Sequence, residues 1–195
     1  MKYNIIFLDF DGLLNNIPEL ISRQRNLIEG QTKEYDLKLK STEGLDEFWA
    51  NEMCWSNFKP MIKCLSNIPN VKIVLSTSWR TIKNVDHWNY QFNLINGWDF
   101  EIIDKTPNNI YNSLEYEIIG GYLSSYCRGI EIDTWLRINK DKVSNYCVID
   151  DEADMLIEQE NNFVKTNQDI GFCDEDIYKV WKIFGVKGAD VKCQN

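Results

Sequence analysis

Two aspartates directly follow a short apolar run near the start of the chain, and this feature constrains the fold more than any other. Residues 5–8 are Ile-Ile-Phe-Leu, and Asp9, Phe10, Asp11 and Gly12 come next. A short apolar run of this kind is typical of a strand buried on both faces of a parallel sheet. Side chains along a strand repeat every two residues, so Asp9 and Asp11 should point to the same side. The segment therefore predicts two neighbouring carboxylates at the carboxyl end of a strand.

Such a pair of carboxylates needs a cation or a shared proton nearby, because two close negative charges repel each other. Gly12 allows the backbone to turn sharply or to approach a ligand closely. The ordinary alternative is a strand that ends in a polar turn, since Asp-Gly is a common turn pair. This segment alone leaves both interpretations open.

Length and charge narrow the class of protein. The 195 residues favour one domain, numbered 1–195, with room for a small insertion, and 44% hydrophobic residues provide a sizeable core. The net charge of −9 argues against a broadly basic surface for nucleic acid. It still allows a small basic pocket that binds one phosphate.

Targeting features and cysteine usage indicate a cytoplasmic protein. No apolar run reaches the length of a membrane span, and the start of the chain lacks the pattern of a secretory signal. The six cysteines are scattered without a Cys-x-x-Cys pair, so we expect reduced thiols and no thiolate metal site.

Apolar periodicity predicts strands that alternate with helices. The expected strands cover residues 5–8, 71–75, 100–103, 146–149 and 163–165. The expected helices begin near residues 16–18, 45, 56–57, 85, 128, 155 and 174. Strands that alternate with helices indicate an α/β fold, a Rossmann-like three-layer α/β/α sandwich with a mostly parallel central sheet.

Two segments fit this alternation poorly. Residues 15–52 are the least regular part of the chain, and we interpret them as a small cap or insertion over the end of the first strand. A surface loop is the alternative. Residues 105–127 read as a loop or a small hairpin beside the site.

Polar residues follow three of the expected strands. These are Asp9 with Asp11, then Ser76-Thr77-Ser78, and finally Asp150-Asp151. Ligands of such sheets bind at the carboxyl ends of the strands, so one crevice would hold up to four carboxylates and several hydroxyls. Many oxygen ligands without His or Cys select Mg²⁺ rather than zinc. The sequence therefore predicts a magnesium site.

These motifs resemble those of the haloacid dehalogenase-like (HAD) hydrolases. Residues 9–12 are similar to the family's first motif, Asp-x-Asp-Gly, residues 73–77 to its second, and residues 148–151 to its fourth. The segments 76–80, 128–136 and 150–155 further resemble a small subgroup of phosphatase-like domains. Some members of that subgroup occur in, or alongside, RNA-repair proteins. The resemblance covers most of the chain.

The resemblance implies a role for each acidic residue. Asp9 would be the nucleophile that attacks phosphorus, and Asp11 would be the general acid and base. Mg²⁺ would bind Asp9, the backbone carbonyl of Asp11, and Asp151. Asp150 would be an outer or water-mediated metal ligand. The metal would neutralise Asp9 and the phosphate so that two anions can meet.

The resemblance also implies a hydroxyl and a cation beside the phosphate. Thr77 is the preferred hydroxyl, and Ser76 is the alternative. The family's third motif is usually a lysine, whereas the nearest match here is Arg128, just before a helix start. Lys105 is the competing candidate. Arg80 would contact phosphate or substrate, or form a salt bridge with acids near the site.

Four further residues lie beside these motifs. Gly12 and Ser78 are candidate substrate-binding positions, because they lie at the ends of the first two motif strands. Trp79 fits the core better than a substrate-stacking role. Asp154 fits a carboxylate at a helix start, where the helix dipole favours negative charge.

The leading functional hypothesis is a Mg²⁺-dependent phosphomonoesterase that forms an aspartyl-phosphate. Its substrate would be a phosphorylated small molecule, a nucleotide or a nucleic-acid phosphate end, and the acidic composition favours a short substrate. We expect no membrane and no obligate protein partner. A non-catalytic module that binds phosphate or nucleotide stays open because of the Arg at the lysine position. A phosphotransferase with an acceptor other than water is the third option.

Overall fold

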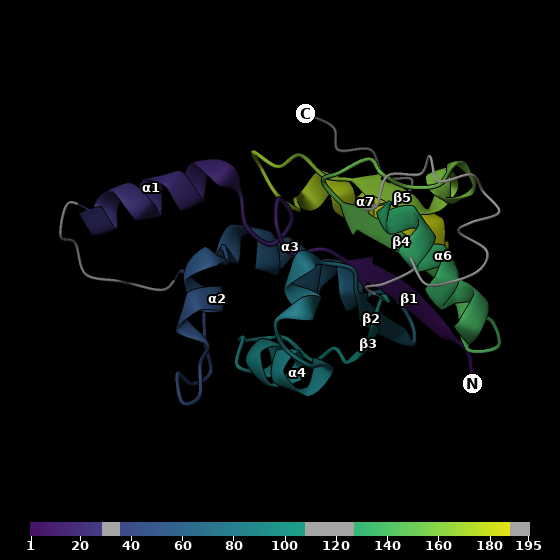
Figure 1. Cartoon of the computed structure of the whole chain (residues 1–195), viewed down its shortest axis with the longest axis horizontal. Helices are drawn as coiled ribbons and strands as arrows, with labels where there is room; N and C mark the ends of the chain where they lie inside the picture. The colour runs from purple at the N-terminus through teal and green to yellow at the C-terminus, as the bar shows by residue number, and fades with distance from the viewer. Residues whose placement is uncertain (29–35, 108–126, 188–195) are drawn as a thin grey trace.

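Five parallel strands form the central layer of the molecule (Figure 1). They are β1 (Tyr3–Leu8), β2 (Val71–Leu75), β3 (Ile102–Lys105), β4 (Val143–Asp150) and β5 (Phe163–Lys165). The computed structural model describes residues 1–28, 36–107 and 127–187. Along the sheet the strand order is β3-β2-β1-β4-β5, and all neighbouring pairs are parallel. The central strand β1 therefore has β2 on one side and β4 on the other.

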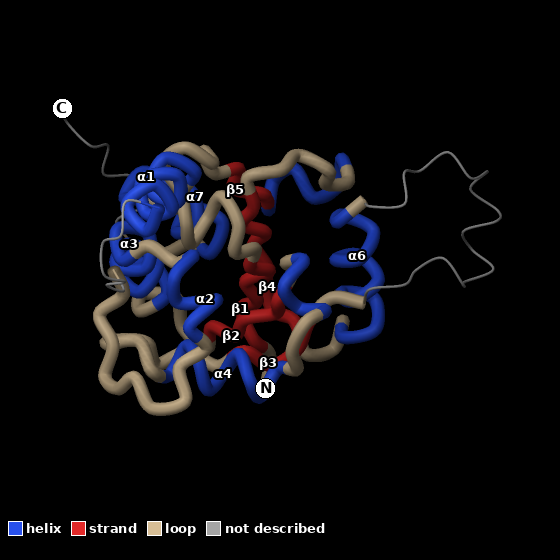
Figure 2. Tube along the Cα trace, turned by 60° about the vertical axis from the view of Figure 1, so that its left-hand side comes forward, coloured by secondary structure: helices blue, strands red, loops and turns tan. Residues whose placement is uncertain are grey.

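Helices cover both faces of this sheet in the described part of the chain. They are α1 (Ile17–Ile28), α2 (Glu47–Glu52), α3 (Trp55–Leu65), α4 (Val85–Asn93), α6 (Arg128–Asn139) and α7 (Asp174–Phe184), with 3-10 turns η1 (Ser78–Thr81) and η3 (Ile157–Asn162). Figure 2 shows α6 on one side of the strands and α3 and α7 on the other. The predicted α/β sandwich with a parallel sheet is confirmed.

Alternating residues of β1 divide the core into two parts. Ile6 and Leu8 face a large apolar cluster that includes side chains of α3, α4 and α7. Ile5 and Phe7 face a smaller cluster with side chains of α6. All four side chains are fully buried, as expected for a strand in the middle of a three-layer fold. The apolar run at residues 5–8 thus has the double-sided burial that the sequence predicted.

The irregular segment 15–52 contains α1 and α2. Trp49 of α2 is fully buried, and its ring lies 5.2 Å from that of Phe92 in α4, so α2 packs on the large core. Helix α1 projects from the rest of the molecule (Figure 1). Arg23 ties α1 to the end of α2, because its Nη1 donates to the carbonyls of Asn51 and Met53. A cap role for the segment stays a prediction.

Several element boundaries differ from those expected. Helix α3 begins at Trp55, so Ser56 and Asn57, the expected start and candidate caps of this helix, lie inside its first turn. The Asn57 amide instead donates to the carbonyls of residues 170 and 172, which holds the loop before α7. Strand β3 begins at residue 102 rather than 100, and η3 begins at residue 157 rather than near 155. Strand β4 is longer than expected and begins at residue 143.

One expectation falls largely on other parts of the chain. Residues 108–126, most of the expected loop or hairpin, lie outside the described residues. Among the helices that are described, none combines the length and apolar character needed to cross a membrane.

Candidate active site

The carboxyl ends of β1, β2 and β4 meet at one edge of the sheet. Leu8 pairs with Leu75 of β2 and with Ile149 of β4, so the residues that follow lie side by side. The Asp9 amide donates to the carbonyl of Ile149 at 3.2 Å, and the Ser76 amide donates to the carbonyl of Leu8 at 2.9 Å. In-register parallel pairing therefore brings the three motif segments together.

Arg128 joins these strand ends from the start of α6. Its Nη1 lies 3.5 Å from Asp9 Oδ1, and its Nε lies 3.1 Å from Asp150 Oδ2. The same guanidinium donates to the backbone carbonyl of Ser76. Lys105, the competing cation, instead donates from Nζ to the carbonyl of Arg80 at 2.8 Å. The structure thus places Arg128 against the carboxylates and Lys105 against the backbone of η1.

Burial dominates the ionisation of the two inner carboxylates. Asp9 is 4% exposed and Asp150 is fully buried. Burial raises the pKa of Asp9 to about 6, and Arg128, the Phe10 amide and the Thr77 hydroxyl offset part of that rise. Burial, followed by the charge of Asp9, raises the pKa of Asp150 to about 8. Because the two carboxyl groups interact, the two pKa values describe the titration of Asp9 and Asp150 as a pair.

Three carboxylates lie close enough to hold one metal ion. Ligand oxygens of Asp9, Asp150 and Asp151 all lie within 4.8 Å of one another. Asp150 Oδ2 is buried and accepts no hydrogen bond of acceptable geometry, although Arg128 Nε lies within ion-pair distance. An all-oxygen set of donors suits Mg²⁺. These residues therefore fit the metal that the sequence predicted.

Gly12 forms one wall of this cluster. Its φ of +63° lies in the left-handed region, which glycine adopts without a steric penalty. A Cβ atom at this position would lie only 2.4 Å from both Cγ and Oδ2 of Asp151. The backbone at Gly12 thus approaches the Asp151 carboxylate more closely than any other residue type would allow.

Asp11 is exposed and lies beside the cluster, held by two side chains. The indole Nε1 of Trp79 donates to its Oδ2 at 2.9 Å, and the amide of Asn15 donates to its Oδ1 at 3.2 Å. Asn15 Oδ1 in turn accepts from the Gly12 amide at 2.8 Å. Sequence reasoning missed Asn15 and the polar contact of Trp79. The Asp-Gly-Leu-Leu-Asn spacing contains the signal for Asn15, because Asn side chains often bond to nearby turn backbone.

The two candidate hydroxyls have different surroundings. The Thr77 hydroxyl interacts with Asp9 and accepts from the amide of Trp79 at 3.3 Å. The Ser76 hydroxyl oxygen is buried and has no hydrogen-bond partner. Ser78 is exposed at the first position of η1. Thr77 is therefore already engaged with the proposed nucleophile, whereas Ser76 keeps an unused donor and acceptor.

Arg80 and Asp154 fix the elements around the site. Arg80 is 5% exposed and forms a salt bridge of 2.5 Å with Glu131 of α6. It also donates to the carbonyls of Thr77 and Thr106, so each of its three nitrogens has a partner within the protein. Asp154 Oδ2 accepts from the Arg128 amide at 2.9 Å, so it caps the start of α6. These contacts position Arg128 rather than a ligand.

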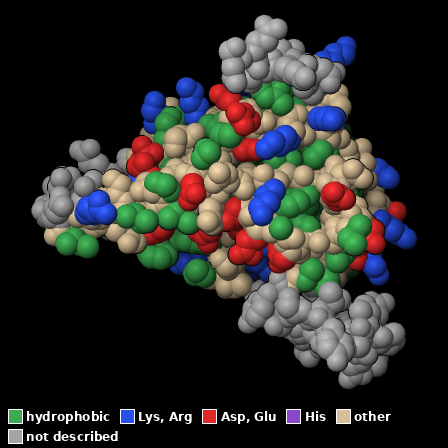
Figure 3. Space-filling view, turned by 90° about the horizontal axis from the view of Figure 1, so that it is seen from above, with side chains coloured by type: hydrophobic (Ala, Val, Ile, Leu, Met, Phe, Trp, Pro, Cys, Tyr) green, Lys and Arg blue, Asp and Glu red, His purple; other side chains and the backbone are tan. Residues whose placement is uncertain are grey.

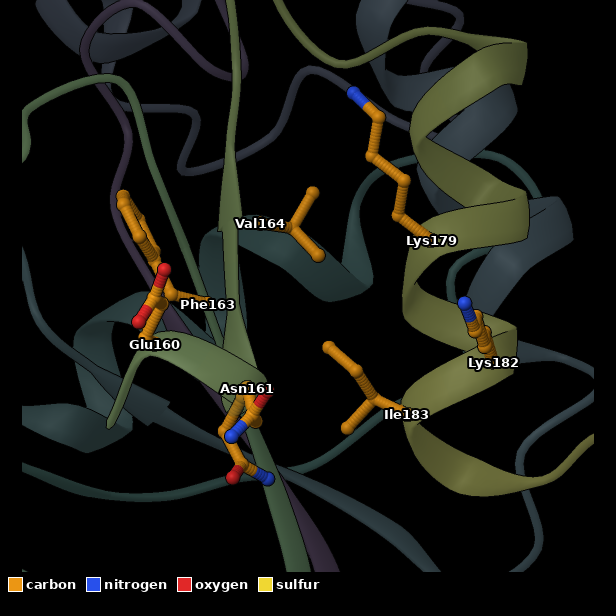
Figure 4. A pocket seen from close by; sticks show the side chains of 8 residues that line it. Glu160, Asn161, Phe163, Val164, Lys179, Lys182 and Ile183 are labelled. Atoms are coloured by element: carbon orange, nitrogen blue, oxygen red, sulfur yellow. The ribbon is translucent and has the colours of Figure 1, made fainter. Parts of the chain in front are cut away.

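A separate cavity of about 600 Å³ lies between η3, β5 and α7 (Figure 4). Lys179 and Lys182 of α7 lie on one side of it and Glu160 and Asn161 of η3 on the other. None of the predicted site residues lines it.

The surface charge matches the acidic composition. In Figure 3, acidic side chains lie among hydrophobic ones across the middle of the face, and Lys and Arg are dispersed. The described part of this face therefore offers no continuous basic track for a long nucleic acid.

Comparisons with known proteins identify the family of the chain. No curated protein and no solved structure matches it. A family model described as "HAD domain in Swiss Army Knife RNA repair proteins" matches residues 5–177. This range includes the Asp9 segment, the Ser76-Thr77 segment, Arg128 and the Asp150-Asp151 pair. The chain therefore belongs to the family of HAD domains found in Swiss Army Knife RNA repair proteins.

Proposed function

We propose that the chain is a Mg²⁺-dependent phosphatase that hydrolyses a phosphomonoester through an aspartyl-phosphate on Asp9. One observation carries this proposal: a buried Asp9 shares Arg128 with Asp150, while Asp11 is held separately at the edge of the cluster. Membership of the HAD family supports phosphoryl chemistry at these residues.

In the first step, a carboxylate oxygen of Asp9 attacks phosphorus, and the bond from phosphorus to the substrate's alcohol oxygen breaks. Asp11 gives its proton to that leaving oxygen, so a neutral alcohol departs. Trp79 and Asn15 orient Asp11 for this transfer. Arg128 pairs with Asp9 and with the incoming phosphoryl oxygens, which offsets the repulsion between two anions.

In the second step, Asp11 accepts a proton from water, and the resulting hydroxide attacks phosphorus. The bond between phosphorus and Asp9 breaks, so inorganic phosphate leaves and both aspartates return to their starting states. The buried hydroxyl of Ser76 has no hydrogen-bond partner among the described residues, which makes it available to a phosphoryl oxygen. Thr77 keeps Asp9 in place.

Asp9, Asp150 and Asp151 would hold the Mg²⁺ ion. When bound, it supplies positive charge to the carboxylates and the phosphoryl oxygens.

The proposed substrate is a nucleotide or the phosphorylated end of a short nucleic acid. The family description names RNA repair proteins, which motivates this choice. The net charge of −9 favours a small substrate or a chain end over a long polymer. The proposed reaction involves neither a membrane nor a protein partner.

The proposal is tested by release of inorganic phosphate from nucleoside monophosphates and from a 3′-phosphorylated oligonucleotide. Release should require Mg²⁺, stop with a chelator, and fall at least a thousandfold in Asp9→Asn, which lacks the nucleophile. Asp174→Asn is the matched control, because this carboxylate lies at the exposed start of α7. Substantial turnover by Asp9→Asn would refute the covalent mechanism.

A second candidate function is a non-catalytic module that binds phosphate or nucleotide. Arg128 favours it, because its guanidinium already occupies Asp9 and Asp150 together. This candidate predicts calorimetric binding of phosphate or Mg²⁺ without any product in a sensitive phosphate assay. A phosphorylated alcohol that appears when acceptor alcohols are added would instead indicate a phosphotransferase.

A further inference from the structure

An exposed aromatic side chain lies close to the proposed acid and base. Phe48 of α2 is 66% exposed, and its ring centroid lies 5.5 Å from that of Trp79 at an interplanar angle of 31°. Trp79 is 9% exposed and donates its indole N–H to Asp11. Two consecutive contacts therefore connect an exposed ring to the carboxylate that would protonate the leaving group.

The exposure of Phe48 is unusual in this chain. Among the described residues, no other phenylalanine and no tryptophan is classed as exposed. The next residue of α2, Trp49, is fully buried in the large core, so α2 is anchored on one side and presents Phe48 on the other. A phenyl ring on a fixed helix loses little further freedom when a ligand packs on it.

Acidic side chains near Phe48 limit the kind of ligand that can bind beside it. Glu52 lies one helical turn after Phe48 and so lies on the same side of α2. Burial and then the charge of Asp11 raise the pKa of Glu52, which shows that the two carboxyl groups interact. Acidic groups here disfavour a second phosphate beyond the reacting one. An uncharged planar group meets the aromatic ring without that repulsion.

We propose that Phe48 stacks on the base of a nucleoside whose phosphate reacts at Asp9. This inference rests on the proposed phosphatase function and names the part of the substrate that α2 recognises. The leaving oxygen lies at Asp11, and the rest of the leaving group extends past the edge of Trp79 toward Phe48. Stacking on an aromatic side chain tolerates every base, so the site would accept different nucleosides.

The test compares nucleoside monophosphates, as 3′ and 5′ isomers, with ribose 5-phosphate, which lacks a base. In Phe48→Ala, the ratio of kcat/KM for the better nucleoside isomer to that for ribose 5-phosphate should fall about five- to a hundredfold. Phe48→Trp should keep or raise the ratio, because an indole also stacks. Ile157→Ala is the matched control, since Ile157 is 86% exposed on η3, and it should leave the ratio unchanged.

Binding separates this inference from the phosphatase proposal. Calorimetry in an Asp9→Asn background, with and without Phe48→Ala, measures the affinity for the same nucleoside monophosphate without turnover. A weaker affinity in the double variant supports the role of Phe48 even if the chain hydrolyses nothing. If both substrates are hydrolysed and the ratio of their kcat/KM values is the same with and without Phe48→Ala, the inference is overturned and the phosphatase proposal stands. Failure of the Asp9→Asn protein to bind the nucleoside monophosphate overturns the inference, and phosphate release by the wild type still tests the phosphatase separately.

Discussion

Replacement of Gly12 by alanine should disable the metal site while the fold persists. The added Cβ would lie 2.4 Å from Asp151 Cγ, whereas nonbonded carbon atoms prefer 3.5–4.0 Å. Asp151 must therefore move by about 1 Å, which exceeds the roughly 0.5 Å tolerance of a functional site. Changes in the groups that orient a metal ligand typically cost about 10–100-fold in metal affinity. The left-handed φ of +63° adds a backbone cost of about 1–2 kcal/mol.

Gly185→Ala separates these two costs. Gly185 has nearly the same φ, +64°, at the end of α7, and a Cβ there would meet nothing within 4 Å. Both variants should lose stability in urea unfolding, with the larger loss in Gly12→Ala because Asp151 must also move, but only Gly12→Ala should lose affinity for Mg²⁺ in calorimetry. Equal Mg²⁺ affinities in the two variants would refute the assignment of Asp151 as a ligand.

Two further predictions concern Asp150 and Asp11. The raised pKa values of Asp9 and Asp150 mean that the metal-free fold retains protons that the unfolded chain releases, so its stability falls as pH rises from about 4 to about 8. Added Mg²⁺ should therefore raise the unfolding temperature more at pH 8 than at pH 6, and this difference should shrink in Asp150→Asn. An equal rise at both pH values would contradict binding of Mg²⁺ by these two carboxylates. Trp79→Phe removes the N–H that orients Asp11, so kcat/KM should fall about 10–100-fold. Trp88→Phe is its control, because the buried Trp88 indole N–H has no partner, and activity should stay near that of the wild type.

The sheet and its site could be predicted because their signals are local. The apolar run 5–8 and the hydroxyl and acidic residues at later strand ends are visible in the chain itself. Parallel pairing then requires those ends to meet, as Leu8 does with Leu75 and Ile149. Gly185 at the end of α7 is equally local, because a left-handed helix end favours glycine.

The rest depends on tertiary contacts that no local pattern encodes. Asn57 resembles a helix cap, but its amide is taken by two carbonyls more than 100 residues away. For Arg80 the sequence leaves phosphate contact and a salt bridge equally open, and only the fold shows that Glu131 of α6 is its partner. Phe48 belongs to an amphipathic helix, and only the fold shows that it lies outside the core beside Trp79.

Arg128, at the proposed position where HAD hydrolases usually carry a lysine, balances only part of the negative charge of the carboxylate cluster. The guanidinium of Arg128 supplies one positive charge to the cluster of Asp9, Asp150 and Asp151. Ionisation of all three carboxyl groups therefore leaves an excess of two negative charges. Burial is the main cause of the raised pKa values of Asp9 and Asp150, and one divalent cation would balance the two excess negative charges entirely. A planar guanidinium reaches two carboxylates and the Ser76 carbonyl together, which a lysine ammonium at the same backbone position could not do with comparable geometry. Arg128 therefore leaves the requirement for a cation in place, and the site should bind Mg²⁺ and phosphate beside it.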